Sequence, residues 1–227
     1  MSTKNRHRVQ NMTNIEQIRS RISEDVFDYT QLMEALSSYQ KPRDVVTSLL
    51  KKEQVIRIRK GLYIFSDLWR KKSIPYNYLA NIIYGPSVVS LDFALSWYGL
   101  IPEGVKQITS VTVSRSRNYN TPLGVFSYKK VPHNLFSVGI DVIENDTVSW
   151  MMALSLKALA DKIWTDKRFK PSSSSSYRAY LFDDLRIDEE RLLQLYHDHG
   201  YVLSSHGLPR KIKWLDLFIK KQINRRK

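Results

Sequence analysis

The stretch VIRIRKGLYIF, residues 55–65, decides the fold at the N-terminal end of this chain. Apolar and cationic side chains alternate before Lys60 and Gly61, and a second alternating run follows them. This pattern is typical of two short antiparallel strands joined by a tight corner. We expect Ile56 and Ile58 to pack on neighbouring helices while the arginines between them face outward. A hairpin with one apolar face toward the protein and one cationic face toward solvent is suited to contact a polyanion.

Three helical segments are predicted before this hairpin. Isoleucines at helical spacing predict a helix over residues 14–22, and a second apolar stripe predicts one over residues 30–36. Asp28 is a candidate N-cap for the second helix, with Gln31 in the capping-box position. Pro42 suits the first position of a third helix. The order of helix, helix, turn, basic helix and basic-tipped hairpin is that of a winged helix-turn-helix.

The exposed side chains of the third helix and of the hairpin are the candidate DNA contacts. In such a fold a short helix enters the major groove and reaches base edges and phosphates. Cations of the hairpin hold the phosphate backbone electrostatically. The alternative reading is a protein-interaction module whose cations form an ordinary solvated face. The winged helix-turn-helix is predicted over residues 13–68, and its candidate DNA-binding residues are Ser38, Tyr39, Lys41, Arg43, Thr47, Lys51, Lys52, Arg57, Arg59 and Lys60.

The distribution of charge favours a polyanionic partner. The net charge is +14, and residues 1–72 carry 15 basic and 8 acidic side chains. Half of the excess therefore lies in the first third of the chain, which is the electrostatic footprint of a nucleic-acid binder. Residues 1–12 are predicted to form a basic, flexible arm.

Composition excludes several other classes of protein. The chain has no cysteine, which excludes disulfide scaffolds, thiolate zinc sites and cysteine nucleophiles, and which suits the cytoplasm. Its first ten residues lack the apolar core of a signal peptide. Residues 73–102 contain a single charge but are interrupted by Pro75 and by Gly85-Pro86, so we interpret them as buried core and expect no membrane partner.

The rest of the chain predicts an α+β protein. A mixed α/β domain is expected over residues 73–170, a serine-rich loop over 171–177 and a helical region over 178–227. The apolar run over residues 147–164 predicts one long buried helix. The remaining elements are predicted as helices over 76–84, 91–98, 188–199 and 209–223, strands over 87–90, 108–113, 125–129 and 136–143, and a polar loop over 114–124.

Candidates for catalysis are few. Three carboxylates, Asp141, Glu144 and Asp146, lie close together in the sequence, and a Mg²⁺-dependent nuclease would use such a set. Their place at a predicted strand-to-helix turn favours a capping role instead. Lys157 and Asp161, four residues apart on a predicted helix, are interpreted as a structural ion pair.

Metal and cofactor signatures are also missing. His197 and His199 are two residues apart on a predicted helix and point in diverging directions, so they do not predict a metal site. No phosphate-binding glycine loop, dinucleotide fingerprint or nucleophile elbow occurs. We therefore predict no catalytic residue, no metal and no cofactor, and we do not expect an enzyme.

A series of motifs resembles the AbiEi family of antitoxins and transcriptional regulators, which belong to abortive-infection toxin–antitoxin operons of type IV. Their order and spacing, over about residues 12–165, carry the resemblance. The motifs are Gly61-Leu62-Tyr63, Pro86, Ser90-Leu91, Ala94-Leu95, Gly99-Leu100, Arg115 or Arg117, and Lys157-Ala158-Leu159 with Asp161.

The resemblance implies a phage-defence function. Members of this family bind inverted repeats in their own promoter through the winged helix and repress the operon, and a homodimer on the repeat is one expected arrangement. Their C-terminal region counteracts a nucleotidyltransferase-like toxin, by direct binding or without a stable complex. Two alternatives stay open: a metal-dependent nuclease targeted by the winged helix, and a stand-alone regulator that responds to a ligand.

Overall fold

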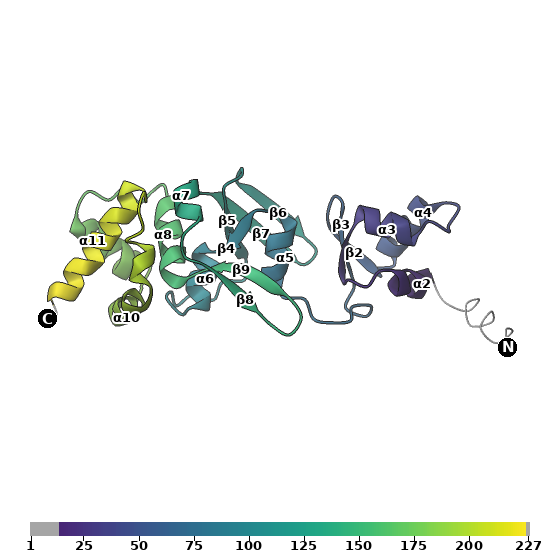
Figure 1. The fold of residues 1–227 in the computed structure, drawn as a ribbon, viewed down its shortest axis with the longest axis horizontal. Coiled ribbons are helices and arrows are strands. Elements are labelled where there is room, and N and C mark those ends of the chain that lie inside the picture. Colours follow the sequence, from purple (N-terminus) through teal and green to yellow (C-terminus); the bar gives the residue numbers. More distant parts are fainter. Residues whose placement is uncertain (1–13, 226–227) are drawn as a thin grey trace. The chain divides into compact units, whose positions relative to one another are not determined.

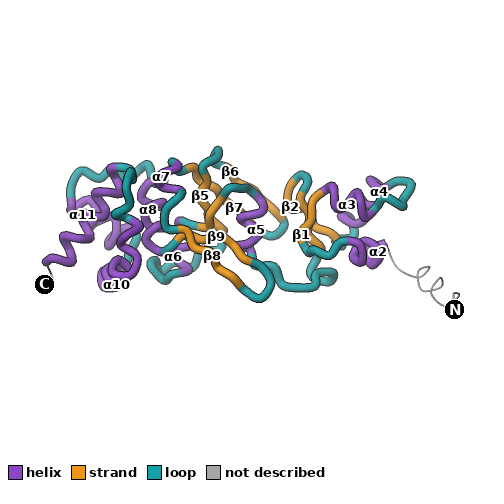
Figure 2. The backbone as a smooth tube through the Cα atoms, in the orientation of Figure 1, coloured by secondary structure: helices purple, strands orange, loops and turns teal. Residues whose placement is uncertain are grey.

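The protein contains both helices and β-sheets (Figures 1 and 2). The computed structural model describes residues 14–225, and the predicted basic arm over residues 1–12 lies outside them. The chain divides into two compact units, one formed mainly by residues up to Ile74 and the other mainly by residues from Pro75 on. Among the described residues, no helix is long and apolar enough to cross a membrane.

The first unit combines three helices with a three-stranded antiparallel sheet of order β1-β3-β2. Each predicted helix is present within one or two residues of its expected bounds. The elements, in chain order, are α2 (Asn14–Arg21), β1 (Val26–Asp28), α3 (Tyr29–Ala35), α4 (Pro42–Lys51), β2 (Val55–Arg59) and β3 (Leu62–Phe65).

The predicted capping box at the start of α3 is confirmed. The Gln31 backbone N–H donates to Asp28 Oδ1 at 2.8 Å, and the Asp28 backbone N–H donates to Gln31 Oε1 at 2.9 Å. These two bonds satisfy donors that the first turn of a helix leaves unpaired. Pro42 lies in the first turn of α4, as predicted.

The hairpin is confirmed, but the faces assigned to its isoleucines are wrong. Val55 pairs with Phe65 and packs with it in the apolar core around the helices, whereas Ile56 pairs with Ile64 on the opposite face. A register shift between Arg57 and Arg59 then places Ile58 in a bulge, buried outside that core. Alternation alone could not tell which face meets the helices.

The face was misassigned because β1 was not predicted. This strand covers the free edge of β3, so that all four residues of β3 are buried. The ring of Phe27 in β1 stacks against Tyr63 and lies 4.6 Å, centroid to centroid, from that of Phe65. These three aromatic side chains pack in the core with the helices. Gly61, with φ +81°, makes the corner, a conformation that glycine adopts without strain.

The second unit is built on a six-stranded mixed sheet of order β6-β7-β5-β4-β9-β8 (Figure 1). Helix α5 contacts β4, β5 and β9, while α6 and α8 pack on each other and on β5 and β9. The strands are β4 (Ser87–Val89), β5 (Ile108–Thr112), β6 (Arg117–Thr121), β7 (Gly124–Lys130), β8 (Ile140–Glu144) and β9 (Ser149–Ala153). The helices around the sheet are α5 (Tyr76–Ile83), α6 (Leu91–Trp97), α7 (His133–Phe136) and α8 (Ser155–Thr165).

The long helix predicted over residues 147–164 is wrong. Its first part is strand β9, which pairs antiparallel with β8, and helix α8 starts only at Ser155. Asn145 turns the chain between the two strands, because its side-chain Oδ1 accepts from the backbone N–H groups of Thr147 and Val148. A short apolar run looks alike in a buried strand and a buried helix.

Two other segments differ from their predictions. The polar loop over residues 114–124 contains edge strand β6, and the strand over 136–143 is divided between α7 and β8. An edge strand needs few apolar residues, which is why the sequence pattern missed β6.

The serine run is not only a loop. Ser173 caps a short helix, α9 (Ser174–Arg178), which continues into a π-helical segment, η1 (Ala179–Asp184). Helices α10 (Glu189–His199) and α11 (Arg210–Arg225) follow and contact α8, with a 3₁₀ turn, η2 (Gly200–Val202), after α10.

A buried ion pair within α8 is bonded to Ser90, the N-cap residue of α6. Lys157 Nζ donates to Asp161 Oδ1 at 2.5 Å, and Ser90 Oγ donates to Asp161 Oδ2 at 2.6 Å. Both charged side chains are completely buried. Burial lowers the pKa of Lys157 and raises that of Asp161, and their mutual attraction opposes both shifts. Gly139, with φ +62°, allows this packing, because a Cβ there would lie 2.9 Å from Lys157 Cβ.

Candidate nucleic-acid interface

Helix α4 presents a polar stripe opposite its apolar one. Val46 and Leu49 are buried, while Arg43, Thr47 and Lys51 are exposed. Because these three residues are four apart, they lie above one another on a single helical face. The Thr47 hydroxyl donates to the Arg43 carbonyl at 3.0 Å, and its oxygen can still accept a bond. The structure thus brings together three of the predicted contacts.

The turn before α4 is held by side chains of α2. Arg21 Nη1 donates to the Ala35 carbonyl at 2.6 Å and to Ser38 Oγ at 3.0 Å. The Tyr39 hydroxyl donates to Gln17 Oε1 at 2.8 Å, and its ring packs against the apolar core. Tyr39 therefore positions α4. Arg21 does the same, and no pattern in the sequence pointed to it.

The hairpin carries the second group of predicted contacts. Arg57 and Lys60 are exposed, and Arg59 is half-buried, with Nη1 donating to the Lys60 carbonyl at 3.1 Å. The Gly61 carbonyl accepts from the Tyr29 backbone N–H at 3.1 Å, which fixes the hairpin corner to the start of α3. A fixed corner holds the hairpin cations in a defined place on the unit.

The cations of this unit fall into two classes. Arg19 is ion-paired with Asp25 at 2.6 Å and lies over the Phe65 ring, and Arg70 is ion-paired with Asp67. Arg19 thus ties α2 to the following turn and to β3, whereas the pair of Arg70 is local. In contrast, exposed candidate contacts lack an ion-pair partner among residues 14–225; they are Lys41, Arg43, Lys51, Lys52, Arg57 and Lys60. A surface with uncompensated cations attracts phosphates at long range.

The other candidate groups do not converge. Among the residues that the structure describes, no three His, Asp or Glu side chains are placed to hold a metal ion. Asp141 and Glu144 lie on edge strand β8 and Asp146 in the following turn, all exposed. His197 and His199 lie in the last turn of α10.

Comparisons with known proteins assign no family to the chain. No protein-family model matches it, and no curated protein matches it. Among solved structures, one similar chain is in the crystal structure of the RV2827C protein from Mycobacterium tuberculosis, with 18% sequence identity and a TM-score of 0.49. That similarity covers 91% of this chain and 82% of the other.

Proposed function

We propose that the first unit is a winged helix-turn-helix that binds double-stranded DNA. In this assignment α4 is the recognition helix and the corner between β2 and β3 is the wing. The observation that carries the proposal is a set of six exposed cations on α4, at its two caps and on the hairpin, which lack ion-pair partners among the described residues. Each phosphate that such cations neutralise releases counterions, so binding should weaken steeply as salt increases.

We further propose that the protein represses its own operon and counteracts a nucleotidyltransferase-like toxin. This part depends on the resemblance to the AbiEi family, and it places the protein in the cytoplasm, with an inverted-repeat operator as its DNA. The proposal assigns no catalytic residue. A gene for a nucleotidyltransferase beside this one, and rescue of growth when both proteins are co-expressed, would support the antitoxin role.

The DNA-binding proposal is tested by fluorescence anisotropy with a duplex that spans the inverted repeat upstream of the gene. Arg43→Ala should weaken binding to the repeat by about tenfold relative to a scrambled duplex, because Arg43 lies on the recognition helix. Arg59→Ala should weaken binding to both duplexes alike and reduce the salt slope by roughly one.

Lys213→Ala, which removes an exposed cation of α11, is the matched control and should leave both affinities unchanged. If Arg43→Ala and Arg59→Ala together left the affinity for the repeat as it is, the winged-helix assignment would be wrong.

A further inference from the structure

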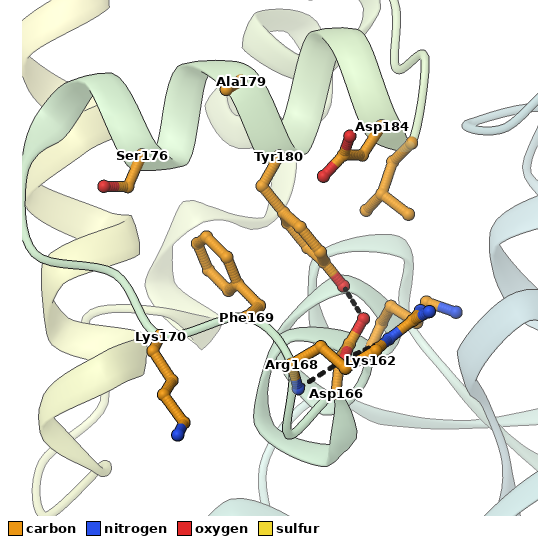
Figure 3. Close-up of a pocket in the computed structure, with 10 residues that line it drawn as sticks. Lys162, Asp166, Arg168, Phe169, Lys170, Ser176, Ala179, Tyr180 and Asp184 are labelled. Carbon is orange, nitrogen blue, oxygen red and sulfur yellow. Dashed lines mark hydrogen bonds and ion pairs between the residues drawn. The ribbon is translucent and has the colours of Figure 1, made fainter.

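A cavity of about 640 Å³ lies in the second unit (Figure 3). Its walls come from the end of α8, the loop over residues 166–170, and α9 with η1. Sites for small organic ligands typically enclose roughly 300–1,000 Å³, so the volume suits a ligand much larger than a single ion.

One wall of the cavity is a π-helical segment. In η1 the Leu185 backbone N–H donates to the Tyr180 carbonyl, five residues earlier, at 2.9 Å. Ala179, Tyr180 and Asp184 of this segment line the cavity. Segments of this kind are rare and recur at functional sites, because the widened turn redirects side chains.

The aromatic wall is held rigidly in place. The rings of Phe169 and Tyr180 are stacked at 3.9 Å, and the Tyr180 hydroxyl donates to Asp166 Oδ2 at 3.1 Å (Figure 3). Lys211 Nζ lies 4.9 Å from the Phe169 ring centroid and donates to the Asp166 carbonyl at 3.0 Å. A ligand would therefore meet a preformed surface and would lose little free energy in ordering it.

Most of the charged side chains that line the cavity are already ion-paired. Lys162, Arg168 and Lys170 line it, and Asp166 already accepts from Arg168 and Tyr180. Lys162 is ion-paired with Asp92 at 2.6 Å, outside the lining. Among the described residues, Lys170 and Asp184 form no ion pair. The unused groups are thus an ammonium, most of an exposed guanidinium and one carboxylate.

We propose that this cavity binds a phosphorylated small molecule of the size of a sugar phosphate or a mononucleotide. Arg168 would hold the phosphate, since a guanidinium can donate to two of its oxygens at once. The Lys170 ammonium, which points away from Arg168, would add only longer-range attraction (Figure 3). Asp184 would accept from hydroxyl or amino groups of the ligand, and the Phe169 and Tyr180 wall would contact its apolar part. Such a site adds a small-molecule effector to the protein and does not depend on the proposed DNA binding.

Isothermal titration calorimetry of the full chain at low salt tests the site with four probes: AMP, ribose 5-phosphate, adenosine and inorganic phosphate. At least one of the two esters should bind, and adenosine should bind about tenfold more weakly or not at all. If AMP binds and ribose 5-phosphate does not, the cavity is a nucleotide site. If both esters bind equally well, it is a sugar-phosphate site. If neither ester bound, or if adenosine or inorganic phosphate bound as well as the esters, the proposal would fail.

Three variants locate the binding. Replacing both Arg168 and Lys170 with Gln should weaken ester binding by about tenfold or more. The neighbouring exposed Lys167 is outside the lining, so Lys167→Gln is the matched control and should change nothing. Ala179→Trp, at an exposed lining position, should block the cavity with all charges retained. Equal losses for Lys167→Gln and the double variant, or full binding by Ala179→Trp, would overturn the assignment.

Discussion

Two groups of charged side chains in this molecule have opposite surroundings. Lys157 and Asp161 are completely buried in the second unit, 2.5 Å apart, with Ser90 completing the set. The cations of α4 and of the hairpin in the first unit are exposed and, among the described residues, unpaired apart from Arg59. Removing one member of a buried pair leaves an uncompensated charge in the core. Removing an exposed cation costs little stability, because water already solvated that charge. The first group should therefore govern stability, and the second should govern binding.

The largest effect is expected from Asp161→Ala. It should lower the free energy of unfolding by about 3–5 kcal/mol, because Lys157 is left buried without its partner. Replacing both residues with apolar ones, Lys157→Met with Asp161→Leu, should cost much less. Urea denaturation followed by tryptophan fluorescence measures both, since four of the five tryptophans lie in the second unit. A double variant as unstable as Asp161→Ala would show that packing, not charge, dominates here.

A smaller, pH-dependent effect on stability is expected at Asp166. This side chain is half-buried, between the buried ion pair and the exposed cations in its access to water. Burial acts to raise the pKa of Asp166, but hydrogen bonds from Arg168 and Tyr180 outweigh it, so the pKa is below its ordinary value of 3.8. A carboxyl with a lowered folded-state pKa stabilises the protein above the unfolded value, and that contribution is lost as the pH falls through the folded-state pKa.

Asp166→Asn should therefore be less stable than the parent protein at pH 7, and the difference should shrink on acidification to about pH 3. Thermal unfolding at the two pH values measures it. A difference that stayed constant with pH would mean that the Asp166 charge has no part in stability.

The smallest effect on stability is expected from substitutions of the proposed DNA contacts, which should affect DNA binding most. Arg43→Ala and Lys60→Ala should each change the free energy of unfolding by less than about 0.5 kcal/mol, as surface substitutions usually do. Arg19→Ala is the contrasting variant, because Arg19 is ion-paired with Asp25 and bonds to the Ile22 carbonyl at 2.6 Å. It should destabilise the first unit by about 1 kcal/mol or more. Comparable losses for Arg43→Ala and Arg19→Ala would remove the distinction between the two classes of cation.

Features set by neighbours in the sequence were predicted well. The capping box of Asp28 and Gln31, the start of α4 at Pro42 and the corner at Gly61 each depend on groups within a few residues of one another. The candidate contacts Arg43, Thr47 and Lys51 share a helical face for the same reason, because their spacing alone places them there.

Features that depend on distant parts of the chain were decided only by the tertiary structure. The apolar run at Trp150 became strand β9 because β4 and β8 lie on either side to pair with it, and β1 turned Val55 rather than Ile56 toward the helices. The burial of Lys157 and Asp161 with Ser90 likewise joins segments far apart in sequence. Hydrogen bonds within a turn depend on residues that are adjacent in the sequence, so the sequence alone determines them. Strand pairing and burial depend on which distant segments pack beside a residue, so only the tertiary structure decides them.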